Sequence, residues 1–86
     1  MEIIYTPRFI RRYKKLPREA REAARRNEKI FRTDPFSPSL KTHKLSGGLK
    51  NFWSFSIDYR YRIIFEFSTQ EDVVYFHTVG THDIYK

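Results

Sequence analysis

Apolar residues recur at helical spacing in the first third of the chain and alternate with polar residues in its second half. The apolar stretch at residues 2–5 predicts a short first strand. Thr6 and Pro7 have the residue types of a helix N-cap and a first helical position, so we expect a first helix of about ten residues to begin there. Its apolar positions are Phe9, Ile10, Tyr13 and Leu16.

A second helix is predicted between Pro17 and Asp34. Pro17 can open a helix, and Pro35 disfavours helical backbone in the residue before it. The apolar stripe of this helix is narrower than that of the first, and the two helices together should form a hairpin. The stripe consists of Ala20, Ala23, Ala24, Ile30 and Phe31.

The second half of the chain predicts strands. Residues 35–45 have the prolines and serines of a loop, and residues 46–48 are a turn signal. Apolar and polar residues then alternate at 53–58 and again at 61–67, and a third strand is expected at 73–79. A polar loop separates the last two of these strands, which is typical of an antiparallel meander.

The predicted order is therefore strand, helix, helix and an antiparallel meander of three strands, to which residues 80–86 could add a fourth short strand or only a last turn. Helices segregated to one face of a sheet make an α+β fold and leave the other face free for function. The 86 residues allow a single domain, placed at residues 1–86. A domain of this size needs large core side chains, and 17% of the chain is aromatic.

The second strand of the meander carries an arginine inside an apolar run. The odd-numbered positions of residues 61–65 should face the helices, which places Arg62 and Glu66 on the free face. A guanidinium in such a strand is unfavourable unless it has a partner. That partner could be Glu66 or Asp58 in an internal ion pair, or a phosphate group whose charge a fixed guanidinium would stabilise.

The chain is strongly basic, with 17 Lys and Arg against 10 Asp and Glu and a net charge of +7. Eleven of the basic residues lie between Arg8 and Arg32, where there are only three acids. This concentration fits either a solvated outer face of the helices or an electrostatic surface for RNA or for an acidic protein segment.

The composition also bears on the compartment. The chain has no cysteine, which excludes disulfides and thiolate metal sites. Its apolar runs are too short to span a membrane, and its first residues lack the long apolar core of a signal peptide. We therefore expect a cytoplasmic protein.

Histidines are the side chains best suited to moving protons near neutral pH. The spacing of His43, His77 and His82 does not fit a zinc motif, so we expect no metal or other cofactor. His82 could be a general acid or base, or a surface histidine of a terminal loop. His43 could serve a phosphate-rich ligand together with Lys41 and Lys44, or could be an ordinary loop histidine, whereas His77 is expected to be structural. Further polar candidates are Lys50, Arg60 and Tyr85.

Several short motifs occur in a defined order. They are HKLSG at residues 43–47, YRIIF at 61–65 and GTH at 80–82. Taken together over nearly the whole chain, they resemble the RelE/ParE toxin superfamily, and the first and last are most similar to its YafQ branch. Further positions that carry the resemblance are Thr6, Pro7, Phe9, Tyr13, Lys14, Lys15, Leu16, Phe52, Trp53 and Tyr85.

The resemblance implies the toxin of a type II toxin–antitoxin system, with the family's βααβββ fold and a separate antitoxin as its partner. Such toxins are metal-independent endoribonucleases that cleave mRNA, often on the ribosome, by attack of a ribose 2′-OH on the adjacent phosphate. By position, Arg62 would stabilise the phosphorane, His82 would be the general acid, and His43 would be a base or would orient the substrate. Tyr85 matches loosely an aromatic residue that stacks on a base or assists proton transfer.

The chain departs from the YafQ branch in the stretch before Arg62. Asp58 could match a catalytic carboxylate of that branch, whereas Arg60 could replace the lysines of the RelE branch. An arginine is too basic to abstract a proton readily, so Arg60 would bind phosphate instead. The general base is therefore not assigned by the resemblance.

Two other functions are compatible with the same resemblance. One is a ParE-like inhibitor of DNA gyrase, and the other is a non-catalytic module that binds RNA or an antitoxin. The presence of both Arg62 and His82 favours the nuclease, because the gyrase-inhibiting branch generally lacks the acid–base set. We expect the free protein to be monomeric.

Overall fold

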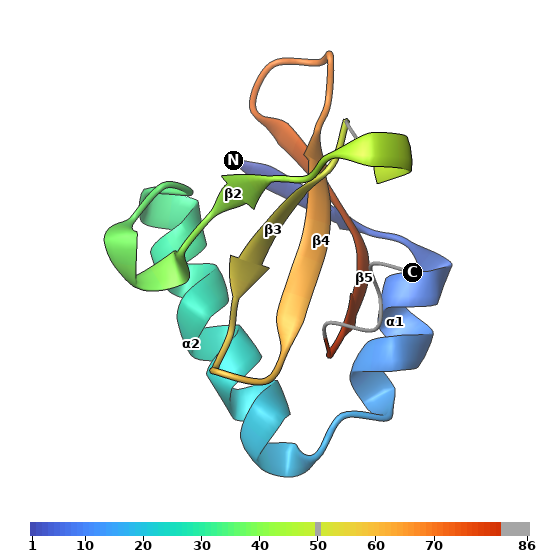
Figure 1. Cartoon of the computed structure of the whole chain (residues 1–86), viewed down its shortest axis with the longest axis vertical. Coiled ribbons are helices and arrows are strands. Elements are labelled where there is room, and N and C mark those ends of the chain that lie inside the picture. Colours follow the sequence, from blue (N-terminus) through green and yellow to red (C-terminus); the bar gives the residue numbers. More distant parts are fainter. Residues whose placement is uncertain (50, 82–86) are drawn as a thin grey trace.

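The computed structural model describes residues 1–49 and 51–81 (Figure 1). It follows the predicted order of strand, helix, helix and meander, so the α+β fold class is confirmed. The helices and strands are β1 (Glu2–Tyr5), α1 (Pro7–Lys14), α2 (Arg18–Thr33), β2 (His43–Lys44), β3 (Trp53–Ser56), β4 (Arg62–Phe67) and β5 (Val73–Gly80).

The two helices begin and end for local reasons. The Oγ1 of Thr6 accepts a hydrogen bond from the backbone N–H of Phe9 (3.1 Å), so Thr6 is the N-cap of α1 as expected. This first helix is shorter than the ten residues expected, because the chain leaves the helix at Lys15 before Pro17. The second helix ends at Thr33, in agreement with the restriction that Pro35 places on Asp34.

Within the described residues, the strands form one mixed sheet in the order β1-β5-β4-β3-β2. The neighbours β5, β4, β3 and β2 are antiparallel, as the meander predicts, whereas β1 pairs in parallel with β5. The expected loop at 35–45 contains a short 3-10 helix at Pro38–Leu40 and the two-residue strand β2. A strand of two residues has no alternation to detect, which is why the sequence pattern did not predict it.

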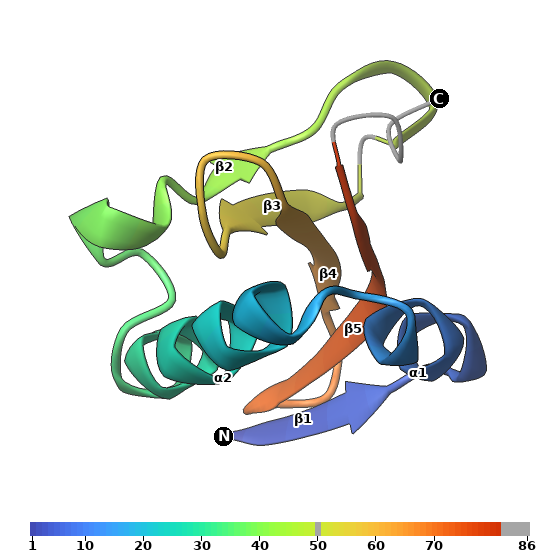
Figure 2. The ribbon, with the colours of Figure 1, turned by 90° about the horizontal axis from the view of Figure 1, so that it is seen from below.

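Both helices pack on the same face of the sheet (Figure 2). Phe31 of α2 lies at the centre of the core, and its ring centroid is 4.9 Å from those of Phe55 and Phe65 and 5.5 Å from that of Phe76. All four rings are fully buried. Each ring pair adds about 0.5–1.5 kcal/mol beyond its burial, so this cluster fixes the position of α2 on the strands that carry the candidate site.

Candidate functional site

A cavity of about 270 Å³ lies where α2, the segment after Pro38–Leu40 and the turn between β3 and β4 meet. We call it the hairpin pocket. It brings together three predicted site residues from two separate segments of the chain, Lys41 on one side and Asp58 and Arg62 of the β3–β4 turn on the other. The full set that lines it is Asn27, Ser39, Lys41, Ser56, Ile57, Asp58, Tyr59 and Arg62.

Arg62 is half-buried at the start of β4, and its guanidinium is held by backbone oxygens. Its Nη1 donates to the carbonyl oxygens of Asp58 (3.0 Å) and Tyr61 (3.2 Å). No carboxylate in the described part of the chain forms an ion pair with it. Glu66, one of the two expected partners, lies against Nε2 of His77 instead (2.9 Å). The guanidinium is therefore oriented by neutral carbonyl groups, and no carboxylate among the described residues lies against it.

Asp58 organises the turn that carries Arg62. Its Oδ1 accepts hydrogen bonds from the backbone N–H groups of Arg60 (2.8 Å) and Tyr61 (2.7 Å), an arrangement in which an aspartate side chain stabilises a turn. The backbone N–H of Ile57 donates to the carbonyl of Tyr61 (3.1 Å) and closes the turn. The structure thus gives the carboxylate of Asp58 a structural use, and its part in proton transfer stays a prediction.

Asn27 ties this turn to α2. Its Nδ2 donates to the carbonyl oxygens of Ser56 (2.8 Å) and Ile57 (3.2 Å), 29 and 30 residues away in sequence. Strand β2 pairs with β3 only at Trp53 and Ser54, so it does not reach the carbonyl groups of Ser56 and Ile57. Asn27 therefore satisfies edge groups that no neighbouring strand satisfies.

The tip of the turn carries a tyrosine and an arginine side by side. Tyr59 is 85% exposed and also lines the hairpin pocket. The Nη2 of Arg60 donates to the hydroxyl of Tyr59 (3.3 Å), and the guanidinium carbon lies 5.6 Å from the centre of the ring. This hydrogen bond raises the pKa of Arg60 further above its ordinary value. Arg60 is therefore a permanent cation, consistent with a binding role rather than proton transfer.

Lys41 approaches the pocket from the opposite wall in an unusual backbone conformation. Its φ of 53° and ψ of 39° are in the left-handed region, which a residue with a Cβ occupies at some cost. Its backbone N–H donates to the carbonyl of Pro38 (3.2 Å), and its own carbonyl lies 3.1 Å from Nδ1 of His43. Non-glycine residues with such backbone are found preferentially at functional sites.

The strand register places His43 on the same face as Arg62. His43 lies opposite Ser54, and Ser54 and Ser56 share a face because they are two residues apart. Ser56 in turn lies opposite Arg62. His43 is exposed and does not line the hairpin pocket, and Lys44, the next residue of β2, is on the other face. The predicted site residues His82, Lys50 and Tyr85 lie outside the described residues.

Besides Ile57, which was expected only as an apolar strand position, sequence reasoning missed four residues of the hairpin pocket. Ser39, Ser56 and Tyr59 occupy ordinary loop and strand positions, and nothing in their types distinguished them. Asn27 did give a signal, because it is a poor helix former in the middle of a helix built from alanine and charged residues.

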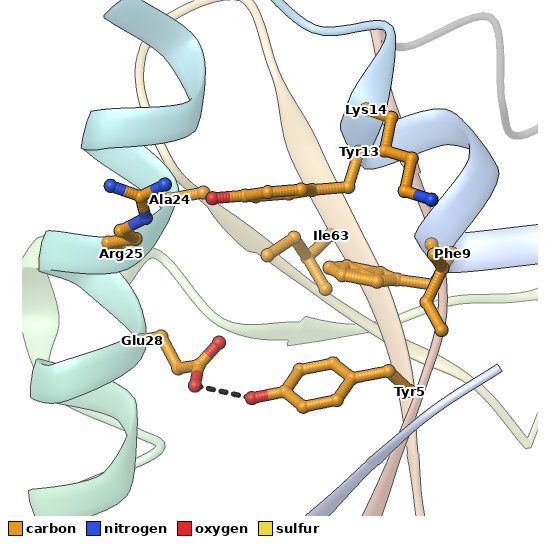
Figure 3. A pocket seen from close by; sticks show the side chains of 9 residues that line it. Tyr5, Phe9, Tyr13, Lys14, Ala24, Arg25, Glu28 and Ile63 are labelled. Carbon is orange, nitrogen blue, oxygen red and sulfur yellow. Dashed lines mark hydrogen bonds between the residues drawn. The ribbon is translucent and has the colours of Figure 1, made fainter. Parts of the chain in front are cut away.

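A second hollow of about 420 Å³ lies between α1 and α2 and is mainly apolar (Figure 3). We call it the helix groove. At one end the hydroxyl of Tyr5 donates to Oε2 of Glu28 (2.6 Å), and burial together with this bond raises the pKa of Tyr5. The lining residues are Tyr5, Phe9, Ile10, Tyr13, Lys14, Ala24, Arg25, Glu28 and Ile63, and none of them is a predicted catalytic residue.

Two further searches cover residues 1–49 and 51–81. In this part of the chain, no group of three or more His, Cys, Asp or Glu side chains is placed so that it could hold a metal ion. None of the helices there is both long and apolar enough to cross a membrane.

Comparison with known proteins finds similar solved structures but no protein of similar sequence. No family model and no curated protein sequence matches the chain. Among solved structures, YafQ from E. coli strain BL21(DE3) superposes with a TM-score of 0.79 at 15% identity, over 98% of this chain and 96% of YafQ. The YoeB/ParE toxin from Agrobacterium tumefaciens gives 0.80 at 18% identity, over 95% and 99% of the two chains.

A third similar structure is a chain of the E. coli DinJ–YafQ toxin–antitoxin complex, with a TM-score of 0.77 at 17% identity over 96% of this chain and 93% of the other. At these identities the likeness concerns the fold. The chain therefore has the RelE/ParE-like toxin fold, which confirms the fold that the sequence motifs led us to expect.

Proposed function

We propose that the protein is the toxin of a type II toxin–antitoxin pair and acts as a metal-independent endoribonuclease on mRNA, bound to the ribosome. Its fold is that of YafQ and the YoeB/ParE toxin. The observation that carries the proposal is the guanidinium of Arg62, which lies in a polar pocket, is oriented by two carbonyls and is paired with no carboxylate among the described residues.

The reaction requires little besides positioning and charge stabilisation. The 2′-oxygen of a ribose attacks the adjacent phosphorus, its proton passes to a base, and the 5′-oxygen leaves with a proton from an acid. The products are a 2′,3′-cyclic phosphate and a 5′-hydroxyl. The extra negative charge develops on the phosphate oxygens, where a fixed guanidinium is most effective, and this is the role proposed for Arg62.

The remaining predicted residues receive roles around this centre. We assign proton transfer to His43 and His82, and contacts with RNA phosphates or bases to Lys41, Arg60, Lys44, Lys50 and Tyr85. Asp58 is assigned to hold the turn, because both of its hydrogen bonds are to backbone amides of that turn.

The test is cleavage mapped by primer extension, on mRNA in prebuilt ribosome complexes and on free mRNA in excess EDTA. We expect the wild type to cut at defined positions. The cleavage rate of Arg62→Ala should be lower by a factor of roughly 10² or more. Arg11→Ala is the matched control, because Arg11 is an exposed cation of α1 outside both hollows, and it should cut like the wild type. A folded wild type that cuts neither substrate would contradict the proposal.

Gyrase inhibition is the second candidate, because one of the similar structures is described as a YoeB/ParE toxin. Supercoiling by purified gyrase in the presence of the protein distinguishes the two functions. A nuclease leaves supercoiling unchanged, whereas a gyrase inhibitor reduces it and is insensitive to Arg62→Ala.

The proposed partner is a cognate antitoxin with an apolar and acidic segment. The helix groove offers an apolar floor, and the two helices beside it carry ten Lys and Arg against three Glu. Ile10, at the rim, is 43% exposed. Ile10→Asp should therefore abolish copurification with the antitoxin and leave mRNA cleavage intact, whereas retained copurification would place the partner elsewhere. The free toxin should be a monomer in light scattering.

A further inference from the structure

Tyr59 differs from the other exposed aromatic residues of the described chain. Its side chain is 85% exposed, the largest value among the exposed large hydrophobic residues. Phe36 is also exposed, but its ring packs against those of Trp53 (5.5 Å) and Phe67 (6.0 Å) and thereby anchors a loop. Among the described residues, the ring of Tyr59 forms no aromatic pair, and the guanidinium of Arg60 lies over it, 5.6 Å from its centre. Its exposure is therefore not explained by packing.

The backbone that presents Tyr59 is fixed on both sides. Asp58, the residue before it, accepts from two backbone amides of the turn, and Asn27 of α2 holds the carbonyls of Ser56 and Ile57. Arg62 adds a bond back to the carbonyl of Asp58. A ring on a prearranged turn can bind a ligand without the entropy loss of ordering a loop, which increases affinity.

The surroundings of Tyr59 match an unpaired nucleotide. The ring lines the same pocket as the cations Arg62 and Lys41, and Arg60 is its direct neighbour. Proteins that bind single-stranded nucleic acid combine such cations, which contact the backbone, with aromatic rings on which bases stack. Three cations around one exposed ring provide both parts within a single turn and the wall opposite it.

We infer that Tyr59 is a stacking platform for an unpaired RNA base next to the phosphate that Arg62 binds. The inference rests on the proposed function, because it assumes that the RNA phosphate lies at Arg62. Stacking uses the face of the ring and not its hydroxyl, so any base is accepted and phenylalanine can replace tyrosine. The platform thus selects single-stranded over double-stranded RNA.

The test uses binding rather than cleavage. The probe is a fluorescein-labelled single-stranded RNA with 2′-O-methyl riboses, which has no free 2′-OH and cannot be cut, and its Kd is measured by fluorescence anisotropy. We expect Tyr59→Ala to weaken binding roughly 10-fold or more, and Tyr59→Phe to bind like the wild type. The same oligonucleotide in a duplex should bind equally to wild type and Tyr59→Ala, because its bases are already stacked in pairs.

The salt dependence separates the ring from the cations. Removing a phosphate contact lowers the slope of log K against log salt, whereas removing a stacking ring leaves this slope unchanged. Tyr59→Ala should therefore keep the wild-type slope, and Arg62→Ala should reduce it. Circular dichroism checks that Tyr59→Ala is folded. Folding should be unchanged, because the side chain of Tyr59 is 85% exposed.

The outcomes distinguish this inference from the proposed function. Wild-type cleavage that needs Arg62, together with single-strand affinity unchanged in Tyr59→Ala, would overturn the platform alone and leave a protein partner as the occupant of Tyr59. A wild type that binds the probe through Tyr59 but cuts no mRNA would overturn the nuclease and support the platform. A wild type that does not bind the probe would overturn the platform.

Discussion

The guanidinium of Arg62 donates to the backbone carbonyl oxygen of Asp58, 3.0 Å away, and not to the carboxylate of the same residue. That carboxylate accepts instead from the backbone amides of Arg60 and Tyr61. The two side chains thus support one turn without neutralising each other. Because the position of Arg62 depends on this turn, residues that hold the turn should affect the proposed RNA cleavage without contacting the RNA.

Asp58→Asn should preserve the turn, because the amide oxygen of asparagine can accept the same two backbone hydrogen bonds. We expect protection of the Arg60 and Tyr61 amides from hydrogen exchange to remain, and most of the cleavage rate with it. Asp58→Ala should lose both, with a decrease of about 1–2 kcal/mol in the free energy of unfolding. If cleavage instead falls roughly 10²-fold in Asp58→Asn while both amides stay protected, the carboxylate is the general base.

Asn27→Ala should loosen the same turn from the side of the helix. The carbonyls of Ser56 and Ile57 lose their donor, and we expect the free energy of unfolding to fall by about 1–2 kcal/mol in urea titrations. Arg62 should then be less well oriented, so kcat for cleavage should fall more than the affinity for RNA. Arg26→Ala, an exposed position next to it in α2, should change neither quantity. Equal stability of the two variants would rule out this role of Asn27.

The local elements could be predicted from the sequence because their causes are local. Prolines and the N-cap Thr6 determine where α1 and α2 begin or end, and alternation at β4 places Ile63 and Phe65 in the core. These effects act over a few residues and are visible in the order of residue types. The same alternation predicted that Arg62 lies on the sheet face opposite the helices.

The features that the sequence did not predict depend on contacts between distant residues. The parallel pairing of β1 with β5 joins residues about seventy positions apart, and no local pattern encodes it. The same is true of Arg62: the internal ion pair with Glu66 or Asp58, one of its two expected partners, does not form, and backbone carbonyls orient the guanidinium instead. Asn27 became a site residue only when folding placed α2 beside the β3–β4 turn.

Tyr5 should make stability depend on pH in the alkaline range. Its pKa is raised above the ordinary value near 10 by burial and by its bond to Glu28, so the folded protein holds the tyrosine proton more tightly than the unfolded chain. This contribution is fully present below the unfolded pKa and is lost as pH rises through the folded one. Urea midpoints from pH 9 to 11 should therefore fall less steeply for Tyr5→Phe than for the wild type. Equal slopes would show that the Tyr5–Glu28 bond does not couple to folding.

The same substitution, Thr→Val, should have opposite effects at two positions. The hydroxyl of Thr78 in β5 is buried and has no hydrogen-bond partner within the described residues, whereas that of Thr6 accepts from the N–H of Phe9 and donates to the carbonyl of His77 (2.8 Å). A buried hydroxyl without a partner is unfavourable, and valine keeps the β-branched shape that suits a strand. Thr78→Val should therefore raise the free energy of unfolding by about 1 kcal/mol.

Thr6→Val should lower that free energy by about 1–2 kcal/mol, because the helix loses its N-cap and the part-buried carbonyl of His77 loses its donor. For a domain of this size, each kcal/mol corresponds to a shift of about 4–8 °C in Tm, which calorimetry resolves easily. The pair controls for the general effect of replacing a hydroxyl by a methyl group in this fold. A decrease in Tm for Thr78→Val would mean that its hydroxyl has a partner in solution, and the sheet face opposite the helices would then contain a polar contact at Thr78.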